Sequence, residues 1–308
     1  MDYVYSIVMG IVQGLTEFLP VSSSGHLTLV QHIFGVDGEG NFFFNVMLHV
    51  GTLVAVCVFY YKLLWDLIKS FFLLAGKILT GKFKWKDRTE EENMIFMLIV
   101  SLVPLFLLFL PVPGMDCNFK DLSEMFSENK YLIVVSSLLL VTSVLLTTGI
   151  ICNKRNCRKS KTGGRYTYNI IDAIVVGITQ DIATLPGISR SGSTLAAAEM
   201  RGINKQKAID YTFILGTPTI LASAVFELKD AFDTPVASSY SLGVLPLVVG
   251  MIVSAVVGYL AIWIFKWFLK TDKMYIFAIY TAVVGIVGII IAIIEMQTGT
   301  NIFSGAKL

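Results

Sequence analysis

Long apolar stretches recur along the chain, and several have the length of about 20 residues that crosses a bilayer core. They predict six membrane spans, near residues 42–61, 93–112, 131–151, 207–228, 242–268 and 274–296. Between the first two, residues 63–80 mix aromatic and aliphatic with charged side chains, a pattern typical of an amphipathic helix lying in the membrane interface. With 55% hydrophobic residues, the chain is too apolar for a soluble domain. We therefore expect a single integral membrane domain over residues 1–308.

Two further apolar segments are too short or too interrupted to be clean spans. Residues 3–19 contain Gln13 and Glu17 and stop at Pro20, and residues 26–35 form another short piece. Between them lies Ser22-Ser23-Ser24-Gly25-His26. Polar groups at membrane depth must pair or line a wet cavity. This region therefore predicts a re-entrant hairpin whose turn carries a functional site.

The loop charges predict an orientation. Lysine and arginine dominate loops 62–92, 152–168 and 266–275, whereas acids match or outnumber them in loops 113–130 and 229–241. The positive-inside rule places the first three loops in the cytoplasm and the other two outside. Both termini then lie outside. The net charge of +2 carries little information, and no patch suggests nucleic-acid binding.

The second half of the chain repeats a pattern of the first. Gly10-Ile11-Val12-Gln13 recurs as Gly177-Ile178-Thr179-Gln180, at an offset of 167 residues. At the same offset, Ser22, Ser24 and Gly25 match Ser189, Ser191 and Gly192. The halves enter the membrane from opposite faces, so we expect an inverted-topology repeat.

The predicted fold class is therefore an all-α polytopic membrane protein, in which each half is a re-entrant helical hairpin plus three transmembrane helices. Repeat 1 covers about 1–152 and repeat 2 about 169–296, joined by the basic cytoplasmic loop 153–168.

The residues of the two turns favour an anionic ligand. Arg190 presents a fixed fork of donors that matches phosphate and stays charged when desolvated. Hydroxyls and glycines surround it, and backbone N–H groups can approach an anion at helix starts. These candidate substrate-binding residues are Gln13, Ser22, Ser24, Gly25, Ser189, Ser191, Gly192 and Thr194. The pattern predicts a phosphate site where the two turns meet.

Glu17 indicates that the site does more than bind an anion. A carboxylate beside phosphate indicates a bridging divalent cation or a proton acceptor. Ser23 could act as nucleophile with Glu17 as base and Arg190 as charge stabiliser. His26, one helical turn away, is an alternative proton carrier. Simpler roles stay open: Ser22 and Ser189 could only cap helices, and His32 and His49 could be ordinary polar contacts.

The two motifs resemble the bacterial undecaprenyl-pyrophosphate phosphatase family of the bacitracin-resistance type. They are Gln13-Gly14-Leu15-Thr16-Glu17-Phe18-Leu19-Pro20-Val21-Ser22-Ser23-Ser24-Gly25-His26 and Leu185-Pro186-Gly187-Ile188-Ser189-Arg190-Ser191-Gly192-Ser193-Thr194. The resemblance implies hydrolysis of undecaprenyl pyrophosphate to undecaprenyl phosphate and inorganic phosphate, which recycles the lipid carrier of cell-wall synthesis. It also implies dependence on Mg²⁺ or Ca²⁺, an outward-facing site in the bacterial cell membrane, homodimers and bacitracin resistance.

The resemblance also implies roles for single residues. It makes Ser23 the nucleophile, Arg190 the phosphate-binding arginine, His26 an assisting residue and Glu17 the second acid of a Glu/Gln-x-x-x-Glu motif. Gln13 takes the first place, where many members have glutamate, so one possible metal charge is missing. Glu17 is then the predicted metal ligand, with Gln13 as a candidate second one. Attack by serine and attack by metal-bound water both stay open.

A second class of function also fits the pattern. Inverted repeats with broken helices are common in transporters, so a polyprenyl-phosphate flippase or an anion transporter is the alternative. Ser23 and Glu17 discriminate between the two, because hydrolysis through a serine nucleophile needs both groups.

Overall fold

The described part of the chain is almost entirely helical. The computed structural model describes residues 2–36, 42–115, 117–126, 132–159, 164–233 and 243–306. Its helices are α1 (Asp2–Phe18), α2 (Ser23–Phe34), α3 (Phe42–Phe59), α4 (Tyr61–Leu79), η2 (Trp85–Asp87), α5 (Glu90–Leu102), η3 (Val103–Phe109), α6 (Phe119–Met125), α7 (Leu132–Lys159), α8 (Ile170–Ile182), α9 (Arg190–Met200), α10 (Lys205–Asp233), α11 (Val244–Lys270) and α12 (Tyr275–Thr298). Parts of the predicted loops 113–130, 153–168 and 229–241 lie outside the described residues.

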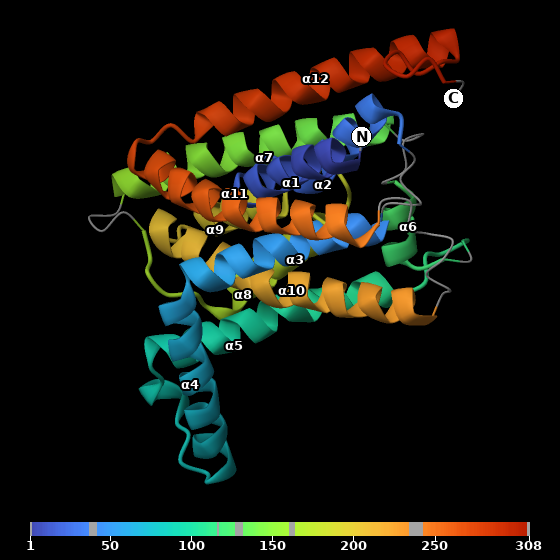
Figure 1. The fold of residues 1–308 in the computed structure, drawn as a ribbon. Coiled ribbons are helices and arrows are strands. Elements are labelled where there is room, and N and C mark those ends of the chain that lie inside the picture. The colour runs from blue at the N-terminus through green and yellow to red at the C-terminus, as the bar shows by residue number, and fades with distance from the viewer. Residues whose placement is uncertain are drawn as a thin grey trace.

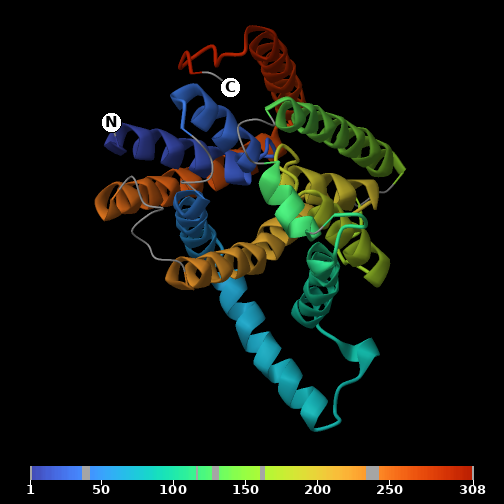
Figure 2. The same cartoon turned by 90° about the vertical axis from the view of Figure 1, so that its right-hand side faces the viewer.

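Five stretches are long and apolar enough to cross a membrane. They are Glu90–Phe109, Leu132–Asn156, Lys205–Val225, Val244–Phe268 and Tyr275–Thr298. A sixth candidate is the bent pair formed by α3 and α4, whose axes differ by 83°. The long helices run beside one another across Figure 1, whereas α4 projects away from them in both views (Figures 1 and 2). The chain is therefore all-helical with five to six candidate spans.

Prolines and helix extensions shift some predicted boundaries. The span predicted at 93–112 is α-helical only to Leu102 and continues as the 3₁₀ helix η3, which contains Pro104, because proline lacks the N–H that an α-helix needs. The helix α7 continues to Lys159, so the start of the predicted loop 153–168 is helical. Likewise, α10 runs through residue 229 to Asp233.

Two pairs of short helices carry the predicted site. The pair α1 and α2 meets at residues 19–22, and the pair α8 and α9 meets at 183–189. Ser22 Oγ accepts a hydrogen bond from Gly25 N at the start of α2, and Ser189 Oγ accepts one from Gly192 N at the start of α9. Ser22 has φ +74°, a conformation that is strained for a residue with a side chain. Both turns are thus closed by the same serine cap.

Glycines allow α1 to lie directly against α11. A Cβ on Gly14 would lie 2.8 Å from Gly258 N and 2.8 Å from Ser254 O. A Cβ on Gly10 would lie 2.6 Å from Gly250 O. Backbones approach this closely only where one partner has no side chain. Because α1 also carries Gln13 and Glu17, this contact sets the position of the first half of the site.

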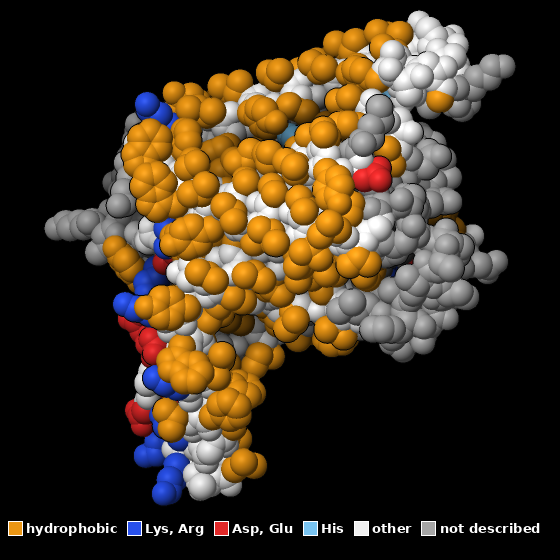
Figure 3. All heavy atoms as spheres, viewed as in Figure 1, with side chains coloured by type: hydrophobic (Ala, Val, Ile, Leu, Met, Phe, Trp, Pro, Cys, Tyr) orange, Lys and Arg blue, Asp and Glu red, His pale blue; other side chains and the backbone are white. Residues whose placement is uncertain are grey.

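The projecting helix α4 has one apolar and one charged face. Its exposed apolar side chains are Trp65, Ile68, Phe71, Phe72, Leu73, Ile78 and Leu79. In Figure 3 the hydrophobic side chains of this arm face one way and its lysines the other. Lys77 Nζ lies 2.5 Å from Glu92 Oε1 and ties the end of α4 to α5. This arrangement suits a helix lying in the membrane interface.

We expect Gly14→Val to destabilise the protein, because the added side chain must enter the α1–α11 contact. Overpacking of this kind costs about 1–3 kcal/mol. The measurement is the thermal unfolding midpoint in detergent. The matched control is Leu15→Val, at a side chain that is exposed to the surroundings. An unchanged midpoint for Gly14→Val would contradict the close contact.

We also expect Trp65 to lie at headgroup depth. In a variant that keeps Trp65 and replaces the three other tryptophans with phenylalanine, lipids brominated near the headgroup should quench its fluorescence more than lipids brominated near the chain end. Efficient quenching by aqueous iodide, with none from either lipid, would place α4 in solvent instead.

Candidate active site

The two turns pack against each other through glycines. A Cβ on Gly25 would lie 3.1 Å from Gly187 Cα, and a Cβ on Gly192 would lie 3.2 Å from Pro20 Cβ. Such separations are tighter than ordinary van der Waals contact, so neither position has room for a larger residue. The start of each short helix therefore lies beside the turn of the other pair, as the sequence predicted.

Glu17 is the centre of the cluster that results. Its side chain is 4% exposed. One carboxylate oxygen, Oε2, accepts hydrogen bonds from Ser23 Oγ at 2.7 Å and from Gln13 Nε2 at 3.0 Å. The other, Oε1, pairs with Arg190 Nη2. Four predicted site residues from both pairs of short helices are thus joined directly, and the hydroxyl of Ser23 donates to the Glu17 carboxylate.

Arg190 is held between Glu17 and α10. Its Nη1 donates to Thr219 Oγ1 at 2.7 Å and to Gly216 O at 3.3 Å. The side chain of Arg190 is 25% exposed, so a ligand can reach it, whereas the side chain of Glu17 is buried. A buried charge is tolerated only when it is paired and hydrogen-bonded, and both conditions are met here.

His49 also faces the cluster. Its Nε2 lies 3.4 Å from Glu17 Oε2, and its side chain is 28% exposed. Its other nitrogen, Nδ1, lies 2.8 Å from Asn45 O, which fixes the orientation of the ring. His49 and Arg190 are both partly exposed, so a ligand could enter on their side of the cluster.

His26 makes its hydrogen bonds outside the Glu17 cluster. Its Nδ1 lies 2.7 Å from Ser22 O, and its Nε2 lies 2.9 Å from the hydroxyl of Tyr280 on α12. The two rings are stacked, with centroids 5.5 Å apart. Among the described residues no hydrogen bond joins His26 to Glu17 or Ser23. In this structure His26 supports the strained Ser22 peptide, which immediately precedes Ser23.

The remaining predicted residues mainly build the turns. Ser189 and Ser22 are almost fully buried as helix caps. Ser24 Oγ lies 3.4 Å from Ser22 Oγ, and Ser191 Oγ lies 3.3 Å from Leu19 O. Further contacts bind Thr194 Oγ1 to Arg190 O and to Thr212 Oγ1. These residues surround the cluster without touching Glu17.

The sequence analysis missed Gly216 and Thr219, and it considered His49 only as a possible ordinary polar contact. The rule that singles out ionisable residues inside a span applied to His49 as well as to Glu17. Thr219 follows Pro218 in the middle of α10, where a proline marks a local break in helical hydrogen bonding. Neither signal shows which way the side chain points.

Gln13 provides a test of the predicted metal site. Its Oε1 is buried, and it has no hydrogen-bond partner among the described residues. It belongs to an amide whose nitrogen binds Glu17. A carboxylate and an amide oxygen are both ligands that Mg²⁺ and Ca²⁺ prefer. No group of three or more His, Cys, Asp or Glu side chains in the described ranges could hold a metal. A cation held by Glu17 and Gln13 would therefore need further ligands, such as the oxygens of a phosphate substrate.

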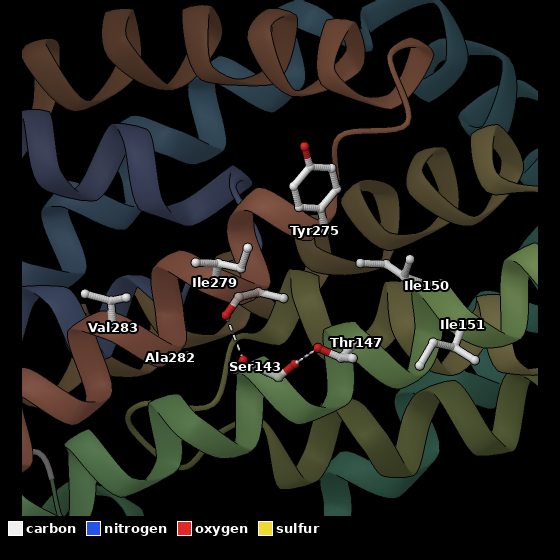
Figure 4. Close-up of a pocket in the computed structure, with 9 residues that line it drawn as sticks. Ser143, Thr147, Ile150, Ile151, Tyr275, Ile279, Ala282 and Val283 are labelled. Atoms are coloured by element: carbon white, nitrogen blue, oxygen red, sulfur yellow. Dashed lines mark hydrogen bonds between the residues drawn. The ribbon is translucent and has the colours of Figure 1, made fainter.

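A separate cavity lies between α7 and α12. It has a volume of about 360 Å³ and is lined by apolar side chains such as Ile150, Ile279 and Val283, with Ser143 and Thr147 as polar members (Figure 4). Ser143 Oγ donates to Ala278 O at 2.7 Å, so its hydroxyl is already used. None of the predicted site residues lines this cavity.

Comparison with known proteins gives consistent matches over almost the whole chain. The family described as "Bacitracin resistance protein BacA" matches residues 6–287. A relative from Alkaliphilus metalliredigens, named undecaprenyl-diphosphatase, is 37% identical over 291 residues, which are 94% of this chain and 98% of the relative. Relatives of the same name from Methanosphaera stadtmanae and Bacteroides fragilis are each 33% identical, over 96% and 95% of this chain and 99% of each relative.

The cluster predicts unequal effects of its two polar side chains on α1, Glu17 and Gln13. Glu17→Ala should lower activity by about 10³-fold, because it removes both the base and the partner of Arg190. Gln13→Ala should lower it by about tenfold, the loss expected for one hydrogen bond to a charged group. Both variants are compared in metal-titrated phosphate-release assays. Equal losses would contradict the assigned difference.

Proposed function

Because this chain belongs to the bacitracin resistance protein BacA family of undecaprenyl-diphosphatases, we propose that its Glu17 cluster removes the terminal phosphate of undecaprenyl pyrophosphate. The chain is thus a hydrolase, and the family description connects it with bacitracin resistance. The single observation that carries the site assignment is the hydrogen bond from Ser23 Oγ to Glu17 Oε2, in a carboxylate that also pairs with Arg190. Nucleophile, base and phosphate-binding group are joined there without an intervening residue.

The first step follows from these contacts. Ser23 Oγ attacks the terminal phosphorus and passes its proton to Glu17 Oε2, 2.7 Å away. The bond between this phosphorus and the bridging oxygen breaks, and undecaprenyl phosphate leaves. Arg190 neutralises charge on the phosphoryl oxygens. Such positioning and charge neutralisation make up most of the catalysis in phosphoryl transfer.

The second step returns the enzyme to its starting state. Glu17 has by then passed its first proton to the departing undecaprenyl phosphate, so it can take a proton from water as the water oxygen attacks the phosphoserine. The bond between phosphorus and Ser23 Oγ breaks, and Glu17 returns the proton to Ser23 Oγ. Inorganic phosphate is released. The exposed sides of Arg190 and His49 offer a polar route for it. The undecaprenyl tail stays in the bilayer throughout, because only the pyrophosphate needs to reach the cluster.

A divalent cation, Mg²⁺ or Ca²⁺, belongs to this proposal. Glu17 and the unpartnered Gln13 Oε1 would hold it, and it would supply neutralisation of phosphate charge. Two protein ligands are few, but Mg²⁺ in phosphoryl-transfer sites is commonly held by one or two carboxylates together with substrate phosphates. Gln13 contributes no charge, so the cation should bind more weakly without substrate than it would beside two carboxylates.

We also propose the inverted-topology repeat. Two observations support it: the matching serine caps of α2 and α9, and the exchange of neighbours between halves. The first short helix of repeat 1, α1, packs on α11, whereas its counterpart α8 packs on α5. The equivalent partners have thus been swapped between halves, as expected for two re-entrant hairpins related by a two-fold axis in the membrane plane.

The membrane orientation is part of the same proposal. The chain is a multi-pass membrane protein, and we place its basic loops in the cytoplasm and the site facing outside. In Figure 1 both termini lie at one end of the bundle. Lysines and arginines gather at the opposite end of the face seen in Figure 3, which supports this placement. We further propose a homodimer in the bacterial cell membrane.

The decisive experiment is phosphate release from undecaprenyl pyrophosphate by the purified protein in detergent, with and without chelator. Ser23→Ala and Arg190→Ala should each reduce release to background with the fold intact, and chelator should reduce wild-type release. The matched control is Lys207→Ala, at an exposed ion pair with Glu90, which should keep full activity.

Near-normal release by Arg190→Ala would contradict the site. If folded wild-type protein with fresh metal released no phosphate, the alternative function as a flippase or transporter would be favoured. Lipid translocation in vesicles would then be measured.

A further inference from the structure

The contacts of Arg190 raise a question that the proposed reaction leaves unanswered. A guanidinium has five N–H donors in a rigid plane. Nη1 has two acceptors on α10, and Nη2 pairs with Glu17. In the part of the chain that the structure describes, Nε makes no hydrogen bond. The side of the guanidinium formed by Nε and Nη2, here called the free edge, therefore offers a ligand the Nε hydrogen and the Nη2 hydrogen that does not bond to Glu17.

Thr219 and Gly216 act together to produce this arrangement. Thr219 Oγ1 donates its own hydrogen to Gly216 O at 2.8 Å. The hydroxyl must then offer a lone pair to Arg190 Nη1, 2.7 Å away. Gly216 O is a second acceptor for the same nitrogen at 3.3 Å. The bond to Gly216 O thus orients the Thr219 hydroxyl, and the hydroxyl in turn orients the guanidinium of Arg190.

The absence of a side chain at Gly216 is the second part of this support. A Cβ there would lie 3.2 Å from Cζ and 3.2 Å from Nη2 of Arg190. Contacts that short would force the guanidinium away from α10 by a few tenths of an ångström. The plane of the arginine lies against the helix backbone because position 216 is glycine.

We propose that Thr219 and Gly216 are positioning residues that hold Arg190 by Nη1 so that its free edge grips the terminal phosphate with two parallel hydrogen bonds. This inference rests on the proposed phosphatase function. Bidentate geometry of this kind gives arginine its advantage over lysine at phosphate sites. A bidentate grip on phosphate requires a guanidinium that cannot rotate. Glu17 alone binds a single nitrogen and would not prevent this rotation.

The test compares Thr219→Val with Thr219→Ser. Valine keeps the branched shape and removes the acceptor, whereas serine keeps the hydroxyl. The matched control is Thr217→Val in the same helix, whose Oγ1 donates to Phe213 O and has no other hydrogen bond within the described part of the chain. For each variant we would measure KM and kcat for undecaprenyl pyrophosphate, and the dissociation constant of inorganic pyrophosphate by calorimetry.

Thr219→Val should raise KM and the pyrophosphate dissociation constant by about tenfold, the effect of one hydrogen bond to a charged group. Thr219→Ser should stay within about twofold of wild type for both constants, the margin that a retained hydrogen bond predicts. Thr217→Val should match wild type. Gly216→Ala should also weaken pyrophosphate binding, since it moves the guanidinium without removing a polar group.

Two results would overturn the inference. One is unchanged pyrophosphate binding by Thr219→Val; the other is an equal loss in Thr219→Ser and Thr219→Val, which would indicate a packing role. Wild-type protein that binds pyrophosphate but releases no phosphate would refute the proposed function. The dissociation constants of pyrophosphate alone would then decide whether Thr219 and Gly216 position Arg190.

Discussion

The ion pair between Glu17 and Arg190 is the interaction on which the rest of the site depends. It joins a carboxylate on the first pair of short helices to a guanidinium on the second. Neither charge could be buried alone without a large desolvation cost. The paired side chains hold the two turns together, and Arg190 keeps N–H donors for a phosphate. The same two side chains therefore join the two turns and form the centre of the proposed phosphate site.

Sequence patterns predicted much of this arrangement. Apolar length predicted the spans, and the repeated Gly-Ile-x-Gln and Ser-x-Ser-Gly elements predicted that two turns would meet. Gln13, Glu17, Ser23 and Arg190 are indeed joined by direct contacts. These predictions succeed because buried polar residues are few in an apolar chain, so each one carries information.

The remaining features depend on which way side chains point across distant helices. His49 and Thr219 reach the cluster from α3 and α10, and spacing along those helices does not reveal this. His26 lies one turn from Ser22 as expected, yet its ring is turned toward Tyr280. The roles of Ser23, His26 and the metal ligands stay predictions, because geometry alone does not measure turnover.

The proposed reacting groups, Glu17, Ser23 and Arg190, stand on the short helices α1, α2 and α9. This has a consequence for how the protein tolerates different bilayers. A bilayer that becomes thicker or thinner acts on long helices, which respond by tilting. The short helices α1 and α9 are held instead by close backbone contacts and by the cap at each turn. A change in bilayer thickness should therefore reach the Glu17 cluster only through the contacts of these short helices with long ones, such as the contact of α1 with α11.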